Sequence, residues 1–190
     1  MKGNQDRRIR KTRQQLRDAM ILLLKEKSIT EISVREISEL ADINRGTFYL
    51  HYKDVYDMVE QIENEIFNEF NSVVNARTTE ELRDNTELIL EDLFNYMSEN
   101  ALLCSVLLSH NGDIAFLQKL TGVVKEKMYH NWDAWYNKEK SCYFNTFSTF
   151  LVAGCVGVIQ EWINGDMIES PHEMAVTIHT IIRKGPAILK

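Results

Sequence analysis

Proline and glycine are scarce in this chain, with 2 Pro and 8 Gly among 190 residues. Both residues disfavour helix interiors, so their scarcity leaves room for long helices and few tight turns. Regular alternation of apolar and polar residues, which is typical of β-strands, is also rare. With 44% hydrophobic residues, the chain still has enough apolar material for a core. The sequence therefore predicts an all-helical protein of one or two domains.

Cysteines and long apolar runs are also few. The three cysteines, Cys104, Cys142 and Cys155, form no CxxC pair and fall within expected helices. Their odd number, together with the lack of a signal-peptide pattern, predicts reduced thiols and a cytoplasmic location. The strongest candidate for a membrane segment, 150–159, has about half the length of a bilayer span. We therefore expect a buried helix there and no membrane association.

The formal net charge of −6 conceals an uneven distribution. Residues 1–53 hold 12 Lys/Arg and 7 Asp/Glu, a net charge of +5. Residues 54–190 hold 10 Lys/Arg and 21 Asp/Glu, a net charge of −11. A basic end on an acidic body suits a protein that binds a polyanion through that end alone. The basic end begins with an arm at 2–13, which has too little apolar content to fold alone.

Three short helical patterns follow the arm. Apolar residues recur at helical spacing over 16–24, behind Thr12, which we expect to cap the first helix. Ser33 and Glu36 form a capping box for the second helix. The third helix is expected over 45–52, after a short polar break. Three short helices behind a basic arm are the minimal arrangement of a helix-turn-helix DNA-binding domain.

Three cations stand where a helix dipole disfavours them. Arg35 lies in the first turn of the second helix, Arg45 starts the third, and Lys53 precedes Asp54, the expected cap of a longer helix. A cation there costs about 0.3–1 kcal/mol, which an arriving phosphate would offset by binding the helix N-terminal amides. Exposed cations without a function are the alternative interpretation. Gly46 either lets a DNA strand come close or merely loosens the start of the third helix.

Aromatic residues divide the third helix into two faces. Phe48 and Tyr52, four positions apart, are expected to hold the helix to the core. Thr47, Tyr49 and His51 are expected on its exposed side. Tyr49 suits a phosphate or a thymine methyl group, and Thr47 a base edge or a phosphate. His51 is either a phosphate donor or a structural histidine.

The stretch from Ile32 to Asp54 resembles the DNA-binding signature of TetR/AcrR-type transcriptional regulators. The resemblance lies in the two-helix pattern, the Gly-Thr-Phe-Tyr sequence at 46–49 and the aromatic-Lys exit at 52–53, and it covers about residues 10–58. Leu50 stands where many members of the family carry a polar or basic residue, so the resemblance assigns it no contact. The family's DNA-contact positions correspond here to Arg35, Asn44, Arg45, Gly46, Thr47, Tyr49, His51 and Lys53.

The rest of the chain divides into a connecting helix at 54–74 and a helical regulatory and dimerisation domain at 75–190. The helix expected at 142–163 is apolar nearly all round, so it must be covered on every side. Either a second subunit or burial within one subunit would cover it, and the family resemblance favours a homodimer. The last helix begins at Ser170, with a proline at its first position and a capping-box Glu173. The expected dimer interface consists of Gly154, Gly157, Val158, Glu161, Met174, Ile178 and Ile181.

A second set of apolar residues in this domain either lines a small-molecule site or belongs to an ordinary core. His110, His130, His172 and His179 show no metal-ligand spacing, and the sequence contains neither a nucleophile triad nor a Gly-rich phosphate loop. We therefore expect that the protein is not an enzyme and that it has no catalytic residue, no cofactor and no metal. The apolar residues that would line the small-molecule site are Phe94, Met97, Leu103, Phe116, Met128, Trp132, Trp135, Tyr136 and Phe147.

Together these patterns predict an all-α protein with an N-terminal three-helix helix-turn-helix DNA-binding domain at 1–53. A C-terminal helical ligand-binding and dimerisation domain follows. The expected function is a sequence-specific transcriptional regulator, a ligand-responsive repressor that binds a palindromic operator as a homodimer. The alternative is a helical protein-interaction module that does not bind DNA and whose basic end binds an acidic protein.

Overall fold

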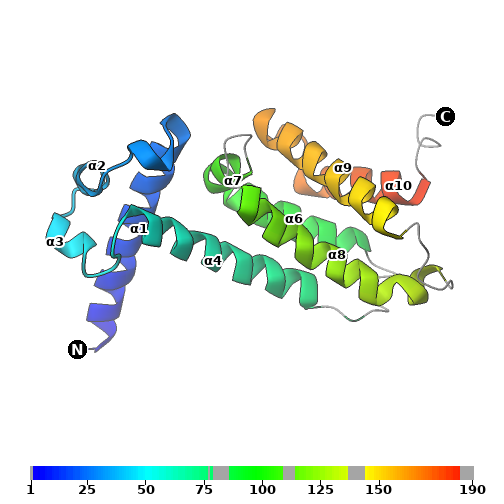
Figure 1. The fold of residues 1–190 in the computed structure, drawn as a ribbon, viewed down its shortest axis with the longest axis horizontal. Helices are drawn as coiled ribbons and strands as arrows, with labels where there is room; N and C mark the ends of the chain where they lie inside the picture. Colours follow the sequence, from blue (N-terminus) through cyan, green and yellow to red (C-terminus); the bar gives the residue numbers. More distant parts are fainter. Residues whose placement is uncertain (1, 77, 79–85, 109–113, 137–143, 185–190) are drawn as a thin grey trace. The chain divides into compact units, whose positions relative to one another are not determined.

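The computed structural model describes residues 2–76, 78, 86–108, 114–136 and 144–184, with the side chains of 2–6 and 131–136 excepted. Every regular element in these ranges is a helix, which confirms the predicted all-α class (Figure 1). The chain divides into two compact units, Met1–Ile66 and Phe67–Lys190. We call them unit 1 and unit 2 and describe each by itself.

Unit 1 is a small bundle in which short helices follow one long one (Figure 1). The side chains of Leu16, Ile37, Phe48 and Met58 are fully buried in it, one from each of its four α-helices. Its elements are α1 (Lys2–Glu26), the 3-10 helix η1 (Ile29–Glu31), α2 (Val34–Leu40), α3 (Arg45–Phe48) and the first part of α4 (Val55–Asn75).

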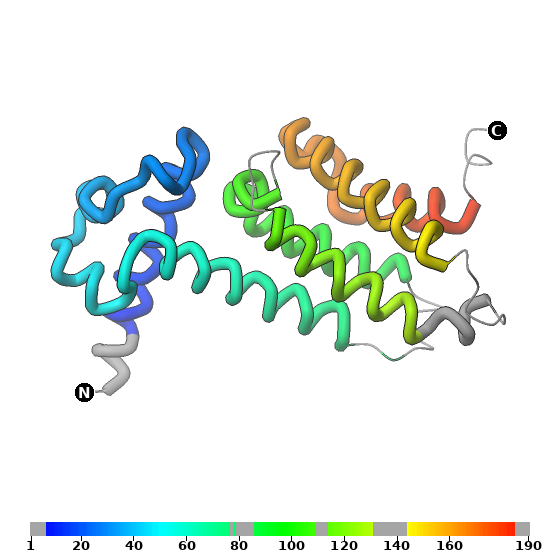
Figure 2. Tube along the Cα trace, in the orientation of Figure 1, coloured from blue at the N-terminus to red at the C-terminus, as the bar shows by residue number. Residues whose placement is uncertain are grey.

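The N-terminal arm is part of α1, which corrects the expectation that a helix begins only after Thr12. Helix α1 runs without interruption from Lys2 to Glu26, and its blue part in Figure 2 forms one continuous coil. Arginine, lysine and glutamine favour helices, and no proline interrupts 2–15. The helix that Leu16 and its neighbours anchor in the core therefore propagates backwards through the arm.

The third helix is shorter than expected, because regular helix ends at Phe48 rather than at Tyr52. Helical hydrogen bonding nevertheless continues beyond it. The amide of Leu50 donates to the carbonyl of Thr47 at 3.2 Å, and that of Tyr52 donates to the carbonyl of Phe48 at 3.0 Å. We call Arg45–Tyr52 the recognition segment, since its backbone stays coiled throughout.

Apart from Thr12, which lies inside α1, the predicted helix caps are confirmed where the structure describes them. The amide of Asp57 donates to Asp54 Oδ1 at 2.8 Å, so Asp54 caps α4. Ser170 Oγ accepts from the amide of Glu173 at 3.3 Å, and the Glu173 carboxylate accepts from the amide of Ser170 at 2.8 Å. A further capping box, at Ser28, starts η1 and was not expected from the sequence. Cys142 and the start of the helix expected at 142–163 lie outside the described part of the chain.

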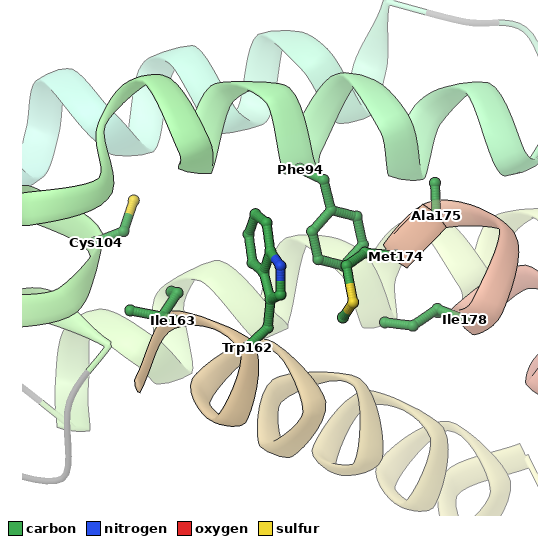
Figure 3. Packing of buried hydrophobic residues seen from close by; sticks show 7 residues of the cluster. All are labelled: Phe94, Cys104, Trp162, Ile163, Met174, Ala175 and Ile178. Carbon is green, nitrogen blue, oxygen red and sulfur yellow. The ribbon is translucent and has the colours of Figure 1, made fainter. Parts of the chain in front are cut away.

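In unit 2 an apolar cluster joins several helices, and Figure 3 shows it in close view. Phe94 of α6 meets Trp162 of α9 edge to face, with ring centroids 5.1 Å apart, and the Trp162 Nε1–H donates to the carbonyl of Glu169 at 2.9 Å. Met174, Ala175 and Ile178 enter the cluster from α10. The helices of unit 2 are α6 (Thr86–Glu99), α7 (Ala101–Leu107), α8 (Ile114–Tyr136), α9 (Phe144–Asn164) and α10 (Pro171–Lys184).

Helix α9 is largely uncovered, which corrects the expectation of a buried helix at 150–159. The side chain of Phe150 is 78% exposed, and only 22% of the most apolar window of this 21-residue helix is buried. The other helices of unit 2 cover one side of α9, through Val152 and Trp162, and leave the opposite side open. By length and composition alone α9 could cross a membrane. One such helix does not indicate a membrane protein, since apolar helices of soluble proteins pass the same test.

Candidate nucleic-acid interface

The recognition segment begins with a side-chain cap. Asn44 Oδ1 accepts a hydrogen bond from the amide of Gly46 at 2.7 Å, so this predicted DNA-contact residue also serves as the N-cap of α3. A Cβ atom at position 46 would lie 3.2 Å from the same Oδ1, closer than most such contacts. Glycine at 46 therefore has a local reason, since it leaves room for the cap that starts the helix.

In the recognition segment, Phe48, Tyr52 and Tyr49 lie on the faces that the sequence predicts for them. Phe48 is fully buried and Tyr52 is 6% exposed, and their rings are 5.5 Å apart. Tyr49 is 59% exposed, and its ring meets the Phe48 ring edge to face. Thr47 and His51 are half-buried. The segment is thus held by two buried rings and presents the Tyr49 ring to solvent.

His51 borders this surface in an environment that disfavours its charged form. Partial burial lowers its pKa from the usual 6.5, and the positive charge of Arg13 lowers it further. The neutral imidazole can donate one ring N–H to a phosphate oxygen. The two interpretations of His51 from the sequence are compatible, because a half-buried ring can pack against its neighbours and donate a hydrogen bond at once.

The start of α2 is fixed by a dense group of hydrogen bonds. The Glu36 carboxylate accepts from the amide of Ser33 at 2.9 Å and from its hydroxyl at 2.8 Å, completing the predicted capping box. The Nζ of Lys27 also donates to Glu36. These bonds, with the Lys27 bond as the largest cause, lower the pKa of Glu36 from its usual 4.5 to about 2.

The three cations that the sequence places at helix starts differ in their partners. Arg35 Nε donates to Glu39 Oε1 at 2.7 Å, and this neighbouring carboxylate raises the pKa of Arg35. Both side chains are exposed, so the pair is weak and open to exchange with a phosphate. Arg45 and Lys53 are exposed, and neither forms an ion pair with any residue that the structure describes. They therefore offer positive charge at both ends of the recognition segment.

Polar contacts between α1 and α4 support the recognition segment from behind, and sequence reasoning missed them. The Arg13 guanidinium donates to Gln61 Oε1 at 2.8 Å and lies over the Tyr52 ring, 5.8 Å from its centroid. Arg17 forms an ion pair with Glu65 at 3.0 Å. Each pair joins residues 48 positions apart. The matching four-residue spacing on both helices is a signal that could have suggested them.

The first turns of α1 carry further exposed cations, in addition to the three that stand at helix starts. Arg7, Arg8, Arg10 and Lys11 are all exposed, and none forms an ion pair within the described residues. By helical periodicity, Arg7, Arg10 and Lys11 share the side of α1 turned away from the buried Leu16. The basic arm is thus a helical surface of positive charge.

The predicted ligand-binding residues divide between two clusters of unit 2. Phe94 belongs to the cluster of Figure 3, and Met97 packs against it. Met128 and Phe147 belong to a separate cluster between α8 and α9. Leu103 and Phe116 are buried. The side chains of Trp132, Trp135 and Tyr136 lie outside the described residues.

The residues predicted for the dimer interface also fall into two groups, one exposed and one buried. Gly154, Gly157 and Glu161 form an exposed stripe on α9, and Ile181 of α10 is 43% exposed. Val158 is partly buried against the cluster of Figure 3. Met174 and Ile178 are buried inside that cluster, so they have little surface left for a partner.

Carboxylate–histidine pairs join α10 to α6. His172 Nδ1 lies 3.2 Å from Glu91, and His179 Nδ1 lies 3.5 Å from Glu87. Within the described residues, no group of three or more histidine, cysteine or acidic side chains could hold a metal ion.

Comparisons with known sequences point to transcriptional regulators. Residues 84–184 match a TetR family model described as the transcriptional regulator C-terminal region. Over 48 residues the chain is 38% identical to YxbF, an HTH-type transcriptional regulator of Bacillus subtilis (strain 168). This match covers 25% of the chain and 13% of that protein, so the chain spans only a small part of the relative.

Solved structures show the same fold over nearly the whole chain. The chain is similar to a TetR transcriptional regulator from Streptococcus agalactiae 2603V, with a TM-score of 0.65 and 20% identity, over 96% of this chain and 99% of that one. It is also similar to the regulator FadR from Bacillus subtilis in complex with stearoyl-CoA. There the TM-score is 0.64 and the identity 14%, over 90% and 98% of the two chains.

The lowered pKa of Glu36 predicts an acid-sensitive start of α2. A carboxylate with a depressed pKa in the folded state stabilises the fold above its unfolded pKa, and this contribution is lost as the pH falls. For Glu36 the loss occurs between pH 4.5 and about 2. We expect Glu36→Gln to be less stable than wild type at neutral pH and to lose less free energy of unfolding over that interval. Urea unfolding followed by circular dichroism measures both.

Glu60→Gln serves as a control, because it removes an exposed carboxylate from α4. It should keep the pH dependence of the wild type. Equal slopes for Glu36→Gln and wild type over this interval would contradict the assignment.

Proposed function

This chain belongs to the TetR family of transcriptional regulators, and on that basis we propose that it represses transcription as a homodimer on a palindromic operator. We further propose that a small-molecule effector releases it from the DNA. The observation that carries the proposal is the recognition segment, in which Tyr49 is 59% exposed above the fully buried Phe48. A helical protein-interaction module without DNA binding is not favoured, because the family consists of DNA-binding regulators.

In the proposed complex the recognition segment enters the major groove. A helix of this kind contacts base edges with its exposed side, while surrounding cations and amides contact phosphates. Thr47 and Tyr49 would face the bases, and Arg45 and Lys53 would bind phosphates at both ends. Arg35 would exchange Glu39 for a phosphate, at little cost because that pair is exposed. The reading surface is thus small and rimmed by positive charge.

The helical arm would extend the contact along the DNA backbone. Leu16 is the first fully buried residue of α1, so about 20 Å of helix precedes it, at about 1.5 Å per residue. The exposed Arg7, Arg10 and Lys11 lie on this extension. Their positive charge complements phosphates that flank the bases read by the recognition segment.

A second copy of the chain is the partner proposed for α9. The exposed stripe of this helix consists mainly of small or apolar residues, among them Phe150, Gly154 and Gly157. Small residues permit close approach of two helices, and a two-fold axis would bring the same stripe from each subunit together. Burial within one subunit, the alternative from the sequence, is not favoured by the exposure of Phe150.

Regulation would act through α4, which runs from unit 1 into unit 2. An effector can release DNA only if it binds more tightly to the DNA-incompetent state. The fold shared with a regulator that carries stearoyl-CoA supports a small-molecule effector in unit 2. This regulatory role, in the cytoplasm and without catalysis, agrees with the family.

Two substitutions test the recognition segment. We expect Arg45→Ala and Tyr49→Ala to weaken binding to the promoter of the protein's own gene by about 10- to 100-fold each, since one such contact is worth about 1–3 kcal/mol. Tyr49→Ala should also reduce the preference for this site over random DNA. Gel shifts over a range of salt concentrations measure both. If both variants bind the site as tightly as the wild type, the recognition segment is wrongly assigned.

The helical arm has its own signature in the salt dependence of binding. Each phosphate contact contributes about 0.9 to the slope of log affinity against log salt concentration. We therefore expect Arg7→Ala/Lys11→Ala to lower the slope by about 1.8 and to leave the preferred sequence unchanged. Lys25→Glu, at the other end of α1, changes the net charge by the same amount and should leave the slope unaltered. An unchanged slope in the arm variant would exclude these contacts.

The homodimer is tested by a glycine on α9. A side chain at Gly157 would meet nothing within 4 Å, so Gly157→Glu leaves the protomer undisturbed. Two like charges facing each other across a two-fold axis should raise the dimer dissociation constant by about tenfold or more. Analytical ultracentrifugation measures the change. Gly122→Glu is the matched control, because Gly122 is equally open but lies on α8. If both variants dimerise alike, the interface lies elsewhere.

A further inference from the structure

Leu50 is the most exposed large apolar residue in the recognition segment, with 81% of its side chain open to solvent. Single exposed leucines are common on protein surfaces, so exposure alone assigns no role. The position of Leu50 within the segment adds the second observation. At 100° per residue, Leu50 and Gly46 lie on the side of the helical coil opposite the buried Phe48. Leu50 thus stands at the centre of the outward face.

The backbone holds this side chain in place from both directions. Leu50 lies between Phe48 and Tyr52, which are both buried, and its amide donates to the carbonyl of Thr47 at 3.2 Å. Side chains on a helix lean towards its N-terminus, so Leu50 leans towards Gly46, which has no side chain. The result is an apolar group on a fixed part of the outward face.

The chemistry of leucine limits what it can contact on DNA. It has no hydrogen-bond donor for a phosphate and none for a polar base edge. The major groove presents one apolar group, the C5-methyl of thymine. A polar or basic residue at this position could bind phosphate, and leucine cannot.

We propose that Leu50 contacts the C5-methyl group of one thymine in each half-site, and so makes recognition depend on that methyl group. This inference rests on the proposed DNA-binding function. Burying one methyl-sized group corresponds to about 0.8 kcal/mol, or about a fourfold change in affinity for each half-site.

The experiment removes single methyl groups from the DNA. Each thymine of one half-site is replaced in turn by 2′-deoxyuridine, which keeps the base pair and lacks only the methyl group. Binding of the full-length wild type and of Leu50→Ala is then measured by fluorescence anisotropy. We expect one replacement to weaken the wild type about fourfold. The same replacement should leave Leu50→Ala unaffected. This variant lacks the contact in both half-sites, so it should bind the unmodified operator about 16-fold more weakly than the wild type.

Two further variants separate Leu50 from its surroundings. Leu40→Ala removes another exposed leucine, on α2, and should keep the full deoxyuridine profile of the wild type. Tyr49→Ala should keep the loss of affinity at the thymine that Leu50 contacts. If it becomes insensitive to a deoxyuridine replacement, this should be at another thymine. Because Leu50 is so exposed, circular dichroism should show the same thermal unfolding for Leu50→Ala and wild type.

Each remaining outcome overturns the inference. A wild type that is insensitive to every replacement has no methyl contact. A Leu50→Ala variant with the wild-type profile shows that another residue makes the contact. If Leu50→Lys strengthens binding to all sequences and steepens the salt dependence, position 50 faces the backbone. A wild type without any preferred site would instead refute the proposed function itself, so the two failures are distinguishable.

Discussion

The burial of the Phe48 ring is the constraint on which the DNA-facing surface depends. Helix α3 is a single turn, and an isolated helix of that length is not stable in water. Its orientation therefore comes from Phe48 and from Tyr52, which anchor it on both sides of Tyr49 and Leu50. Once those two rings are fixed, the backbone leaves no choice about which side chains face outwards. Surface and core are specified by the same eight-residue segment.

The surroundings of Tyr52 extend this constraint to the long helices. Arg13 lies over the Tyr52 ring and donates to Gln61, which in turn donates to Asp57 at 3.0 Å. The Asp57 carboxylate also accepts from the amide of Lys53 at 2.9 Å. A chain of contacts thus joins α1, the recognition segment and the start of α4. Any movement of α4 acts on this network, which gives the proposed regulation a physical route inside unit 1.

In unit 2 the constraint is exposure rather than burial, because α9 is an apolar helix that its own subunit does not cover. Trp162 and Val152 fix one side of α9, while Phe150, Gly154 and Gly157 leave the other side open. Such a surface disfavours an isolated protomer, because apolar area exposed to water costs free energy. The proposed homodimer resolves this cost and would also place two recognition segments on one DNA.

The sequence by itself determined what depends on neighbours a few residues away. Capping boxes, the all-helical class and the opposite faces of Phe48 and Tyr49 follow from local spacing, and all agree with the structure. Tertiary structure decided which surfaces are covered, since that depends on segments distant in the chain. It exposed α9, buried Ile178, and paired Arg13 with a residue 48 positions away. Helical periodicity names an apolar face, but only the packed fold shows whether anything lies against it.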